Sequence, residues 1–379
     1  MANWEVPLSD LVVSEEDIAA VADVYRSGWL SMGPQTEALE SDFAAYTGAG
    51  YAIAVANGTA ALHLICAAAG LGPGDEVVVP SMTFVATVNA VAYTGATPVF
   101  ADIASVTEPW LDLDAVADAI TARTRAILTM AYGGHPGQTA ALRALADERG
   151  VALLEDAAHA AGSWLGQRHL GTFGLAGAFS LFANKNLAVG EGGLVVTDSA
   201  EVAAQIRLLR SHGMTTLTWD RYRGHASRYD VVALGFNYRM DEPRAALARR
   251  RLERLDAENA RRAELDARYR EGLRSIDGIE PTAPGVPDAR LAHHLFIVVL
   301  DEGLDRDRFR DFLATRGIQT SLHYPPVHGF SIYAGARELP VTEAYGRRAV
   351  SLPLYATMTT SQQDRVIEAV DAAVRVVVA

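Results

Sequence analysis

One lysine of the sequence stands in a setting that could support covalent chemistry. Lys185 follows an apolar, strand-like run in the stretch FSLFANKNLAVGEGG, Phe179–Gly193, which contains no other basic residue. A desolvated lysine is a good nucleophile toward carbonyl carbons, although a lysine after a strand is more commonly a solvated loop residue. Lys185 is therefore a candidate nucleophile whose function depends on partners elsewhere in the chain.

An acid and a histidine follow another strand-like run, in the stretch LLEDAAHAAGS. Asp156 could cap a turn, or it could hold the nitrogen of a pyridine ring protonated so that the ring acts as an electron sink. His159, three residues on, would then contact the same ring, and otherwise it is a packing residue. The functional interpretation places Asp156, His159 and Lys185 around one flat cofactor.

A strand-to-helix junction in AVANGTAALHL is a candidate anion site. The strand-like run ends at Asn57, and a helix is predicted to begin near Gly58 and Thr59. Backbone N–H groups at a helix start bind anions, and glycine lets the main chain approach a phosphate closely. An ordinary turn with Thr59 as the cap is the alternative. Ser180, five residues before Lys185, could add a hydroxyl to the same phosphate.

Three further segments contain candidate side chains with weaker local signals. Phe84 in PSMTFVATVNAV could stack on a flat ring or pack in the core. Asn237 in LGFNYRMDEP follows Gly235, and both are turn-forming residues. In TSLHYPPVHGF, His323 and Tyr324 could line a substrate pocket or lie in a proline-stiffened surface loop.

Short apolar runs alternate with helical stretches up to about residue 240, which predicts an α/β fold. The runs are YAIAVAN, EVVVPS, TPVFADI, RAILTMAY, VALLEDAA, AGAFSLFA and GGLVVTD. Near-continuous apolar runs are typical of strands covered on both faces, as in a mostly parallel sheet with flanking helices. Ligands of such sheets bind beyond the carboxyl ends of the strands, where several of the candidate residues lie.

The ends of the chain predict further elements. Ser14 and Asp17 form a capping-box pattern for a helix that ends at Gly28. Residues 242–275 predict one long, ion-paired connector helix with Pro243 in its first turn. Beyond it, the strand HHLFIVVL, the helix DRDRFRDFLATRG, the strand IQTSLHY and the helix SQQDRVIEAVDAAVRV indicate a smaller α+β domain.

This pattern predicts two domains. Residues 1–245 would form a large cofactor-binding domain, and residues 246–379 would form the connector helix and the small C-terminal domain. About the first 25 residues are expected to pack on the small domain.

Composition excludes several classes of function. The net charge is 33 − 46 = −13, which works against binding to nucleic acids or anionic membranes. Cys66 is the single cysteine, so we expect an inert buried thiol, with neither a disulfide nor a metal cluster. The N-terminus lacks a signal-peptide pattern and no long apolar run occurs, so we expect a cytoplasmic protein.

Seven of these segments together resemble one family, the pyridoxal-phosphate-dependent (PLP-dependent) sugar aminotransferases of fold type I known as the DegT/StrS family. The segments are ANGTAAL, PSMTFVATVNAV, EDAAHAAGS, FSLFANKNLAVGEGG, LGFNYRMDEPRAAL, YPPVH and LPLYATMT, and they follow the family's order over nearly the whole chain. The spacing of 29 residues from Asp156 to Lys185, 185 − 156, also fits the family. The resemblance implies the fold type I architecture for the two predicted domains.

The resemblance also implies a function for each candidate residue. Lys185 would form the covalent bond to the cofactor aldehyde and then move protons, while Asp156 would pair with the pyridinium nitrogen. The remaining cofactor contacts would be Gly58, Thr59 and Ser180 at the phosphate, Phe84 stacked on the ring, His159 beside it, and Asn237 at the phosphate of the neighbouring subunit. Many members have glutamine where this chain has His159, and the family's dehydratases have histidine where it has Lys185.

The activity implied is amino transfer by a homodimer with shared active sites. The expected donor is an amino acid, glutamate, and the expected acceptor is a nucleotide-linked 4-keto-6-deoxyhexose carrying dTDP or UDP, with His323 and Tyr324 in the acceptor pocket. The product would enter amino-sugar biosynthesis for a natural product or polysaccharide. Amination of a cyclitol (an inosose) or formation of an aromatic amine is the alternative within the family. A PLP-binding regulator without turnover is the alternative outside it, and the presence of both Lys185 and Asp156 disfavours that reading.

Overall fold

The computed structural model describes residues 4–216, 229–335 and 337–377. Its centre is a seven-stranded sheet in the order β1-β9-β8-β5-β4-β2-β3. In chain order the strands are β1 Tyr51–Val55, β2 Glu76–Pro80, β3 Thr97–Ala101, β4 Thr124–Met130, β5 Ala152–Asp156, β8 Ala176–Ser180 and β9 Gly193–Thr197. Strand β9 runs antiparallel to β1 and β8, and the other neighbouring strands are parallel. The prediction of a mostly parallel sheet is confirmed.

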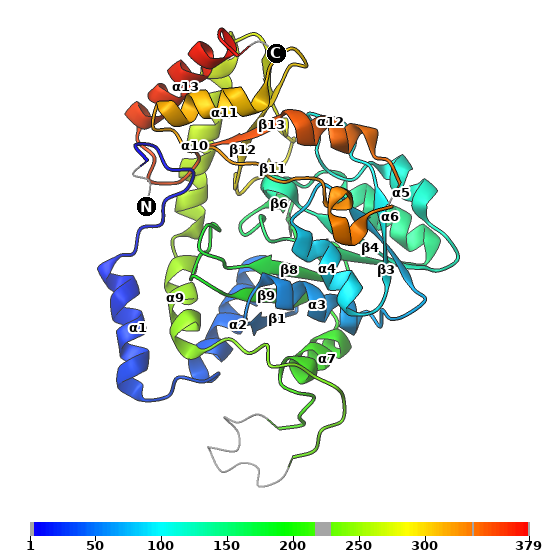
Figure 1. Ribbon diagram of the computed structural model, residues 1–379. Helices are drawn as coiled ribbons and strands as arrows, with labels where there is room; N and C mark the ends of the chain where they lie inside the picture. The colour runs from blue at the N-terminus through cyan, green and yellow to red at the C-terminus, as the bar shows by residue number, and fades with distance from the viewer. Residues whose placement is uncertain (1–3, 217–228, 336, 378–379) are drawn as a thin grey trace.

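Helices cover both faces of this sheet, which explains why its strands are apolar throughout (Figure 1). Alternate residues of a strand point to opposite faces, so Ile53 packs in one core layer and Ala54 in the other. One layer is covered by α3 Gly58–Ala68, α4 Val85–Tyr93 and α7 Ala200–Arg210. The other is covered by α2 Pro34–Thr47, α5 Leu113–Ala119, α6 Thr139–Arg149 and α9 Glu242–Leu252.

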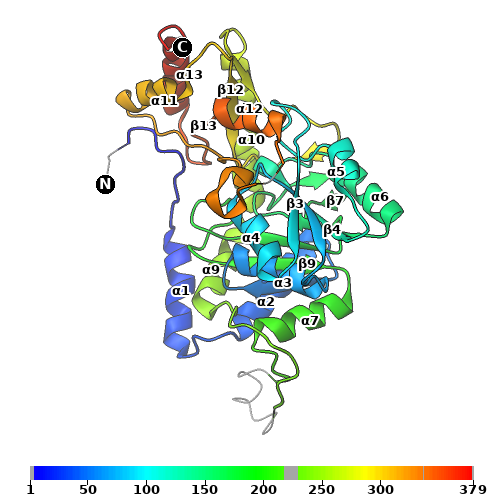
Figure 2. The same cartoon turned by 45° about the vertical axis from the view of Figure 1, so that its right-hand side comes forward.

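The C-terminal part has its own small sheet and its own core. Its antiparallel strands are β10 Ile279–Pro281, β12 Phe296–Leu300 and β13 Ala349–Leu352, and its helices are α10 Leu255–Leu273, α11 Arg306–Thr315, α12 Pro340–Arg348 and α13 Thr360–Val374. Val6 is buried in the same core and forms a bridge to Ile318. Figure 2 shows the N-terminal segment leaving this unit and running down to α1, Glu15–Ser27. The domain boundaries remain a prediction.

Several short elements lie between the parts. A third sheet pairs the segment before β12 with the connection between β5 and β8 of the large sheet. Its three short strands are β11 Ala289–Arg290, β6 Trp164–Leu165 and β7 Arg168–His169. The 3₁₀ turns η2 Val327–Gly329 and η3 Ser331–Tyr333 lie between the loop that carries Tyr324 and α12.

The expected helix over residues 242–275 is wrong in one respect, because it is two helices. Helix α9 ends at Leu252 and α10 begins at Leu255. At this break Arg251 and Arg254 both donate to the fully buried carboxylate of Asp17. Helix α9 packs on α1 and α2, whereas α10 packs on α13, so the two halves follow different surfaces.

The expected strand IQTSLHY is also wrong. Its residues form isolated bridges, Ile318 with Val6 and Ser321 with Ser351, and the chain then turns toward the large sheet. The strand expected from HHLFIVVL begins only at Phe296. The preceding His293 has a positive φ of 44°, and the chain there is held by side chains instead of by a neighbouring strand.

Other local predictions are confirmed. Helix α1 has Ser14 as its cap with the full capping box, and Gly28 ends it at φ 74°, a conformation that glycine adopts without strain. Cys66 is buried, and burial raises the pKa of its thiol to about 12, so the reactive thiolate is suppressed. Among the described helices, none combines the length and the apolar character needed to cross a membrane.

Candidate active site

A cavity of about 410 Å³ lies beyond the carboxyl ends of the sheet strands and collects nearly all the predicted site residues. Its lining includes Gly58, Thr59, Phe84, Asp156, His159, Ser180, Lys185, His323 and Tyr324. Asp156 and Ser180 are the last residues of β5 and β8. Because parallel strands end at one edge of a sheet, residues far apart in sequence meet there.

Asn237 is the exception among the predicted residues. It does not line this cavity, and its side chain is exposed while its backbone forms a bridge to Ser211. A contact with the cavity of the same chain is therefore not made in this structure.

Lys185 projects into the cavity from the turn that follows β8. Its backbone N–H donates to the carbonyl of Phe182 at 2.9 Å. Burial lowers the pKa of its amine to about 8, although the charge of Asp156 works in the opposite direction. A substantial fraction of the amine is therefore neutral and nucleophilic near neutral pH.

Asp156 is buried, with 2% of its surface exposed. Its Oδ2 accepts a hydrogen bond from Thr87 Oγ1 at 2.6 Å, and its Oδ1 accepts one from the N–H of Ala158 at 3.0 Å. Burial raises the pKa of this carboxyl, whereas these donors and Lys185 act to lower it. A cationic N–H donor arriving in the cavity would stabilise the carboxylate further.

Thr87 is a site residue that the sequence reasoning missed. Its hydroxyl donates to Asp156 and is itself within 2.6 Å of Thr83 Oγ1, which lies 3.0 Å from Met130 Sδ. Because the Thr87 proton is directed at Asp156, only the single hydroxyl proton of Thr83 is available for the Thr83–Thr87 contact, and Met130 Sδ is a second acceptor for that proton. The available signal was the four-residue spacing of Thr83 and Thr87 at the start of α4, which places both hydroxyls on one side of the chain.

The start of α3 forms a cradle for an anion. Asn57 caps the helix, with its Oδ1 accepting from Ala60 N–H at 2.8 Å, so the alternative of Thr59 as the cap is wrong. A Cβ atom on Gly58 would lie 2.8 Å from the Cβ of Ser180. Glycine is therefore what allows the helix start to approach β8 closely enough for the backbone and Ser180 to share one ligand.

His159 is held as a neutral imidazole of defined tautomer. Its Nδ1 accepts from the N–H of Gly133 at 3.2 Å, so its proton is on Nε2 and is donated to Tyr324 Oη at 3.0 Å. Burial and the charge of Lys185 lower the pKa of His159. The hydroxyl proton of Tyr324 is consequently free to be donated into the cavity.

His294 and Asn186 complete this side of the site and were also missed. Asn186 Nδ2 donates at 2.7 Å both to Asn259 Oδ1 and to Ala292 O, so its Oδ1 accepts from His294 Nδ1 at 2.9 Å. The ring of His294 lies 4.3 Å from that of His159. The pair of histidines before β12 was the only local signal, and it could not indicate which of them lies against His159.

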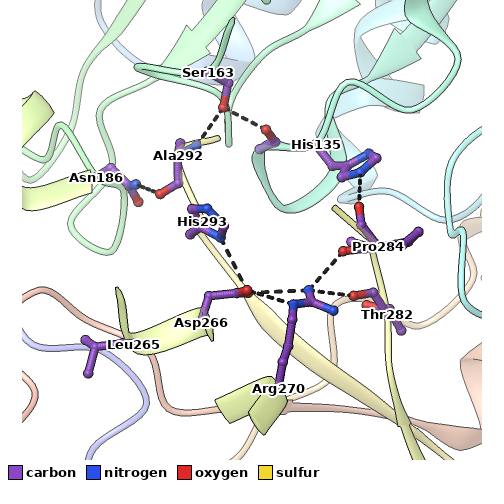
Figure 3. Close-up of polar contacts among 12 residues, drawn as sticks. His135, Ser163, Asn186, Leu265, Asp266, Arg270, Thr282, Pro284, Ala292 and His293 are labelled. Carbon is purple, nitrogen blue, oxygen red and sulfur yellow. Dashed lines mark hydrogen bonds and ion pairs between the residues drawn. The ribbon is translucent and has the colours of Figure 1, made fainter. Parts of the chain in front are cut away.

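Figure 3 shows how the segment that carries His294 is anchored. Ser163 Oγ accepts from Ala292 N–H at 2.9 Å and donates to Gly134 O at 2.7 Å. On the other side His293 Nδ1 lies 3.4 Å from Asp266 Oδ1, and Arg270 also binds Asp266. These contacts orient the two adjacent histidines differently, His293 toward the buried Asp266 and His294 toward His159.

The aromatic and imidazole groups at the cavity mouth leave space for a flat ligand. Phe84 is 51% exposed, and its ring centroid is 5.6 Å from that of Tyr324. His323 Nδ1 is 2.8 Å from Ser351 Oγ, and burial lowers its pKa to about 4. The exposed part of the Phe84 ring, opposite a buried carboxylate and an amine, suits a planar ring with a basic nitrogen.

Comparisons with known proteins agree with this chemistry. The model of the DegT/DnrJ/EryC1/StrS aminotransferase family matches residues 12–371. DesV of S. venezuelae is 40% identical, with a TM-score of 0.88 over 97% of this chain and 98% of that one. The sugar aminotransferase CalS13 of Micromonospora echinospora is 29% identical, with a TM-score of 0.89 over 97% and 99%. Spr1654 of Streptococcus pneumoniae, solved in a PLP form, is 27% identical, with a TM-score of 0.91 over 98% of both chains.

Proposed function

The chain belongs to the DegT/DnrJ/EryC1/StrS aminotransferase family and is a PLP-dependent aminotransferase, and from this premise we propose its reaction. It transfers the amino group of glutamate to the ketone of a nucleotide-linked sugar, a 4-keto-6-deoxyhexose carrying dTDP or UDP. The observation that carries the proposal is the single cavity in which Lys185, Asp156 and the start of α3 meet.

The residues of the cavity fit the cofactor. The Gly58–Ser180 cradle suits its phosphate, because helix-start N–H groups bind oxyanions. The buried Asp156 suits a ring N–H, and the amine of Lys185, whose pKa burial lowers to about 8, suits an aldehyde carbon. When bound, PLP supplies that carbon and a pyridinium ring that accepts the electron pair left by a broken C–H bond.

Each side chain of the cavity would have its own function in the reaction. Lys185 would be the nucleophile that holds the cofactor and the base that moves the α-proton of the amino donor. Asp156 keeps the ring nitrogen protonated, and Thr87 holds the carboxylate in place through a 2.6 Å hydrogen bond. Tyr324, which accepts from His159, is positioned to donate its hydroxyl proton to a cofactor or substrate oxygen.

Substrate assays test the proposed reaction and its rivals together. Purified holoenzyme with glutamate is offered a panel of dTDP- and UDP-linked keto-sugars, alongside inososes, and products are identified by NMR. Amination of a nucleotide-linked keto-sugar supports the proposal. Amination of inososes alone would show that the enzyme aminates cyclitols. If glutamate removes the visible absorbance of the bound cofactor but no acceptor in the panel is aminated, the sugar assignment is contradicted. Failure of glutamate to convert the bound cofactor would favour a regulator.

Lys185 should control the pH dependence of cofactor capture by the apoprotein. Only the neutral amine attacks the aldehyde, so the rate should rise with pH and reach half its maximum near pH 8, because the pKa of this amine is lowered to about 8 by burial. Stopped-flow absorbance after mixing apoprotein with PLP measures this rate. A half-maximum near the ordinary lysine pKa of about 10.4 would show that the amine is solvated.

We propose that the active site is completed by a second copy of the chain. Asn237 faces outward from its own chain, and near it Val231, Val232 and Leu234 are 54%, 58% and 96% exposed. Exposed apolar residues in one stretch are typical of a protein interface. A two-fold dimer would bring Asn237 of one chain to the phosphate cradle of the other.

Mixed dimers test this arrangement. Lys185→Ala and Asn237→Asp should each be nearly inactive, the latter because a carboxylate would face the cofactor phosphate. In a mixed dimer one site collects both changes and the other is intact, so co-expression should restore roughly a quarter of wild-type activity. Verified mixed dimers that stay inactive would place Asn237 in its own subunit's site or outside any site.

Tyr324 should discriminate between the two substrates. In Tyr324→Ala the KM for the keto-sugar is expected to rise by about tenfold or more, with a much smaller change in the KM for glutamate, because a donor to the acceptor is lost. Steady-state kinetics with each substrate varied in turn measure both values. Equal increases in the two KM values would mean that Tyr324 acts on the cofactor rather than on the sugar.

A further inference from the structure

A second cavity, of about 280 Å³, lies next to the first and shares two of its lining residues. Asn184 and Lys185 line both cavities. The second cavity is otherwise bounded by the N-terminal segment at Ser9–Val12 and by three arginines, Arg251, Arg261 and Arg262. Figure 1 shows the N-terminal segment running beside α10 and α9, from which these arginines project. A ligand in the second cavity would therefore reach the reactive amine.

Arg262 is a buried cation that forms no direct ion pair among the residues that the structure describes. It is 7% exposed, and its Nη1 donates to Leu354 O at 3.0 Å. Its Nε has no hydrogen-bond partner. Glu258, one turn earlier on α10, is paired with Arg254 at 2.8 Å and not with Arg262. Burial lowers the pKa of this guanidinium to about 10, although the charge of Glu258 works in the opposite direction.

Other polar groups around the cavity are also unsatisfied. Arg251 is 6% exposed and binds Asp17 and Val12 O through Nη2, but its Nε has no partner. Asn184 Oδ1 is buried without one as well. Buried polar groups that lack partners are uncommon in folded proteins, and several around one cavity indicate a ligand with matching groups.

The charges around this cavity favour an anion. Arg251, Arg261, Arg262 and Lys185 line it, against two acidic residues, Asp10 and Glu258. Arg251 is paired with Asp17 and Arg261 with Glu264, so Arg262 is the guanidinium of this cavity that forms no ion pair within the described residues. A planar guanidinium binds a carboxylate or a phosphate through paired hydrogen bonds.

We infer that the second cavity is an oxyanion subsite in which Arg262 binds a carboxylate or phosphate group of a substrate held at Lys185. The inference rests on the proposed function, because it takes the ligand from the two substrates of that reaction. The side-chain carboxylate of the amino donor and the phosphates of the nucleotide-linked acceptor share this chemistry. The alternative is that Arg262 serves only to hold Leu354 O and the turn at residues 354–357 against α10.

Anion binding to the holoenzyme separates these possibilities. The bound cofactor already fills the cradle at α3, so added anions report on other sites. Thermal unfolding is followed with increasing glutarate, a dicarboxylate that lacks an amino group, or with pyrophosphate. The variants are Arg262→Gln, which removes the charge, and Arg262→Lys, which keeps it. Arg274→Gln is the control, because Arg274 lies at the end of the same helix, is 74% exposed and pairs with Glu271.

We expect one of the two anions to raise the Tm of wild-type, Arg262→Lys and Arg274→Gln holoenzyme, and to have little effect on Arg262→Gln. If the anion is glutarate, the KM for glutamate should rise by about tenfold or more in Arg262→Gln, and if it is pyrophosphate, the KM for the keto-sugar should rise by that factor. If Arg262→Gln does not fold, Arg261→Gln, which alters the open side of the same cavity, should weaken the response to that anion.

Two results would overturn the subsite. Equal Tm responses in Arg262→Gln and wild type would place the anion elsewhere, and the absence of any response together with unchanged KM values would leave Arg262 a structural residue. Failure of the proposed function looks different. Suppose that the wild-type enzyme aminates no nucleotide-linked sugar, but that the Tm response to the anion is lost in Arg262→Gln. The proposed reaction would then be refuted, whereas the oxyanion subsite would be supported.

Discussion

Lys185→Ala is expected to abolish amino transfer, with a loss of at least about a thousandfold in kcat, because both the nucleophile and the base are removed. Lys185 is the only lysine in the chain of 379 residues, so no neighbouring lysine can replace it. The protein should still fold and bind PLP without a covalent bond, because the cradle at Gly58 and Ser180 and the carboxylate of Asp156 are unchanged. Turnover of glutamate and keto-sugar, with absorbance of the bound cofactor, measures both outcomes.

Lys185→Arg is the matched control for charge. It keeps a cation opposite Asp156 but cannot form the bond to the aldehyde carbon, so it should be as inactive as the alanine variant. Because the chain has one lysine, borohydride reduction of wild-type holoenzyme should attach the cofactor to the peptide that contains Lys185, as mass spectrometry can show. Near-normal turnover by either variant, or a label on another peptide, would refute the assignment.

Asp156→Asn should leave the fold intact and reduce kcat by about a hundredfold or more, because a neutral amide does not hold the ring nitrogen protonated. The amide oxygen can keep the hydrogen bond from Ala158 N–H, and the amide NH2 can donate to Thr87 Oγ1 once that hydroxyl rotates away, so stability should change little. A second readout is independent of turnover. The charge of Asp156 raises the pKa of Lys185, so this variant's apoprotein should capture PLP with a half-maximum at lower pH than wild type.

Thr87→Val tests the positioning of the Asp156 carboxylate separately from its charge. It removes one hydrogen bond to Asp156 and keeps the carboxylate, so the loss in kcat should be about tenfold, clearly smaller than in Asp156→Asn. Near-normal kcat in Asp156→Asn, with an unshifted pH profile of capture, would show that another group protonates the ring.

The sequence by itself was sufficient for the mostly parallel sheet with flanking helices and for most of the residues that line the cavity. Apolar runs ended by Asp156 and Ser180, and a glycine at the start of α3, are local patterns. The carboxyl ends of parallel strands meet by geometry, so such patterns predict a shared site even without coordinates. The resemblance to a family, now confirmed by the family model over residues 12–371, supplied the chemistry that joins them.

The tertiary structure decided what depends on contacts between distant segments. The hydrogen bond from Thr87 to Asp156 and that from His294 to Asn186 join strands, helices and loops whose relative placement no local pattern specifies. The break between α9 and α10 follows from packing on two different surfaces. The alternation of charged residues along this segment of the sequence does not predict such a break.

The arginines of α9 and α10 show most clearly that burial and pairing cannot be predicted from local sequence. In sequence they form one alternating charged pattern, typical of a solvated helix. In the folded chain the side chain of Arg250 is 42% exposed and paired with Glu253, whereas Arg262 is buried beside a cavity with no carboxylate bound to it in the described part of the chain. Burial and pairing depend on which surface covers each side chain, and that is a property of the packed fold and not of the residue's neighbours in sequence.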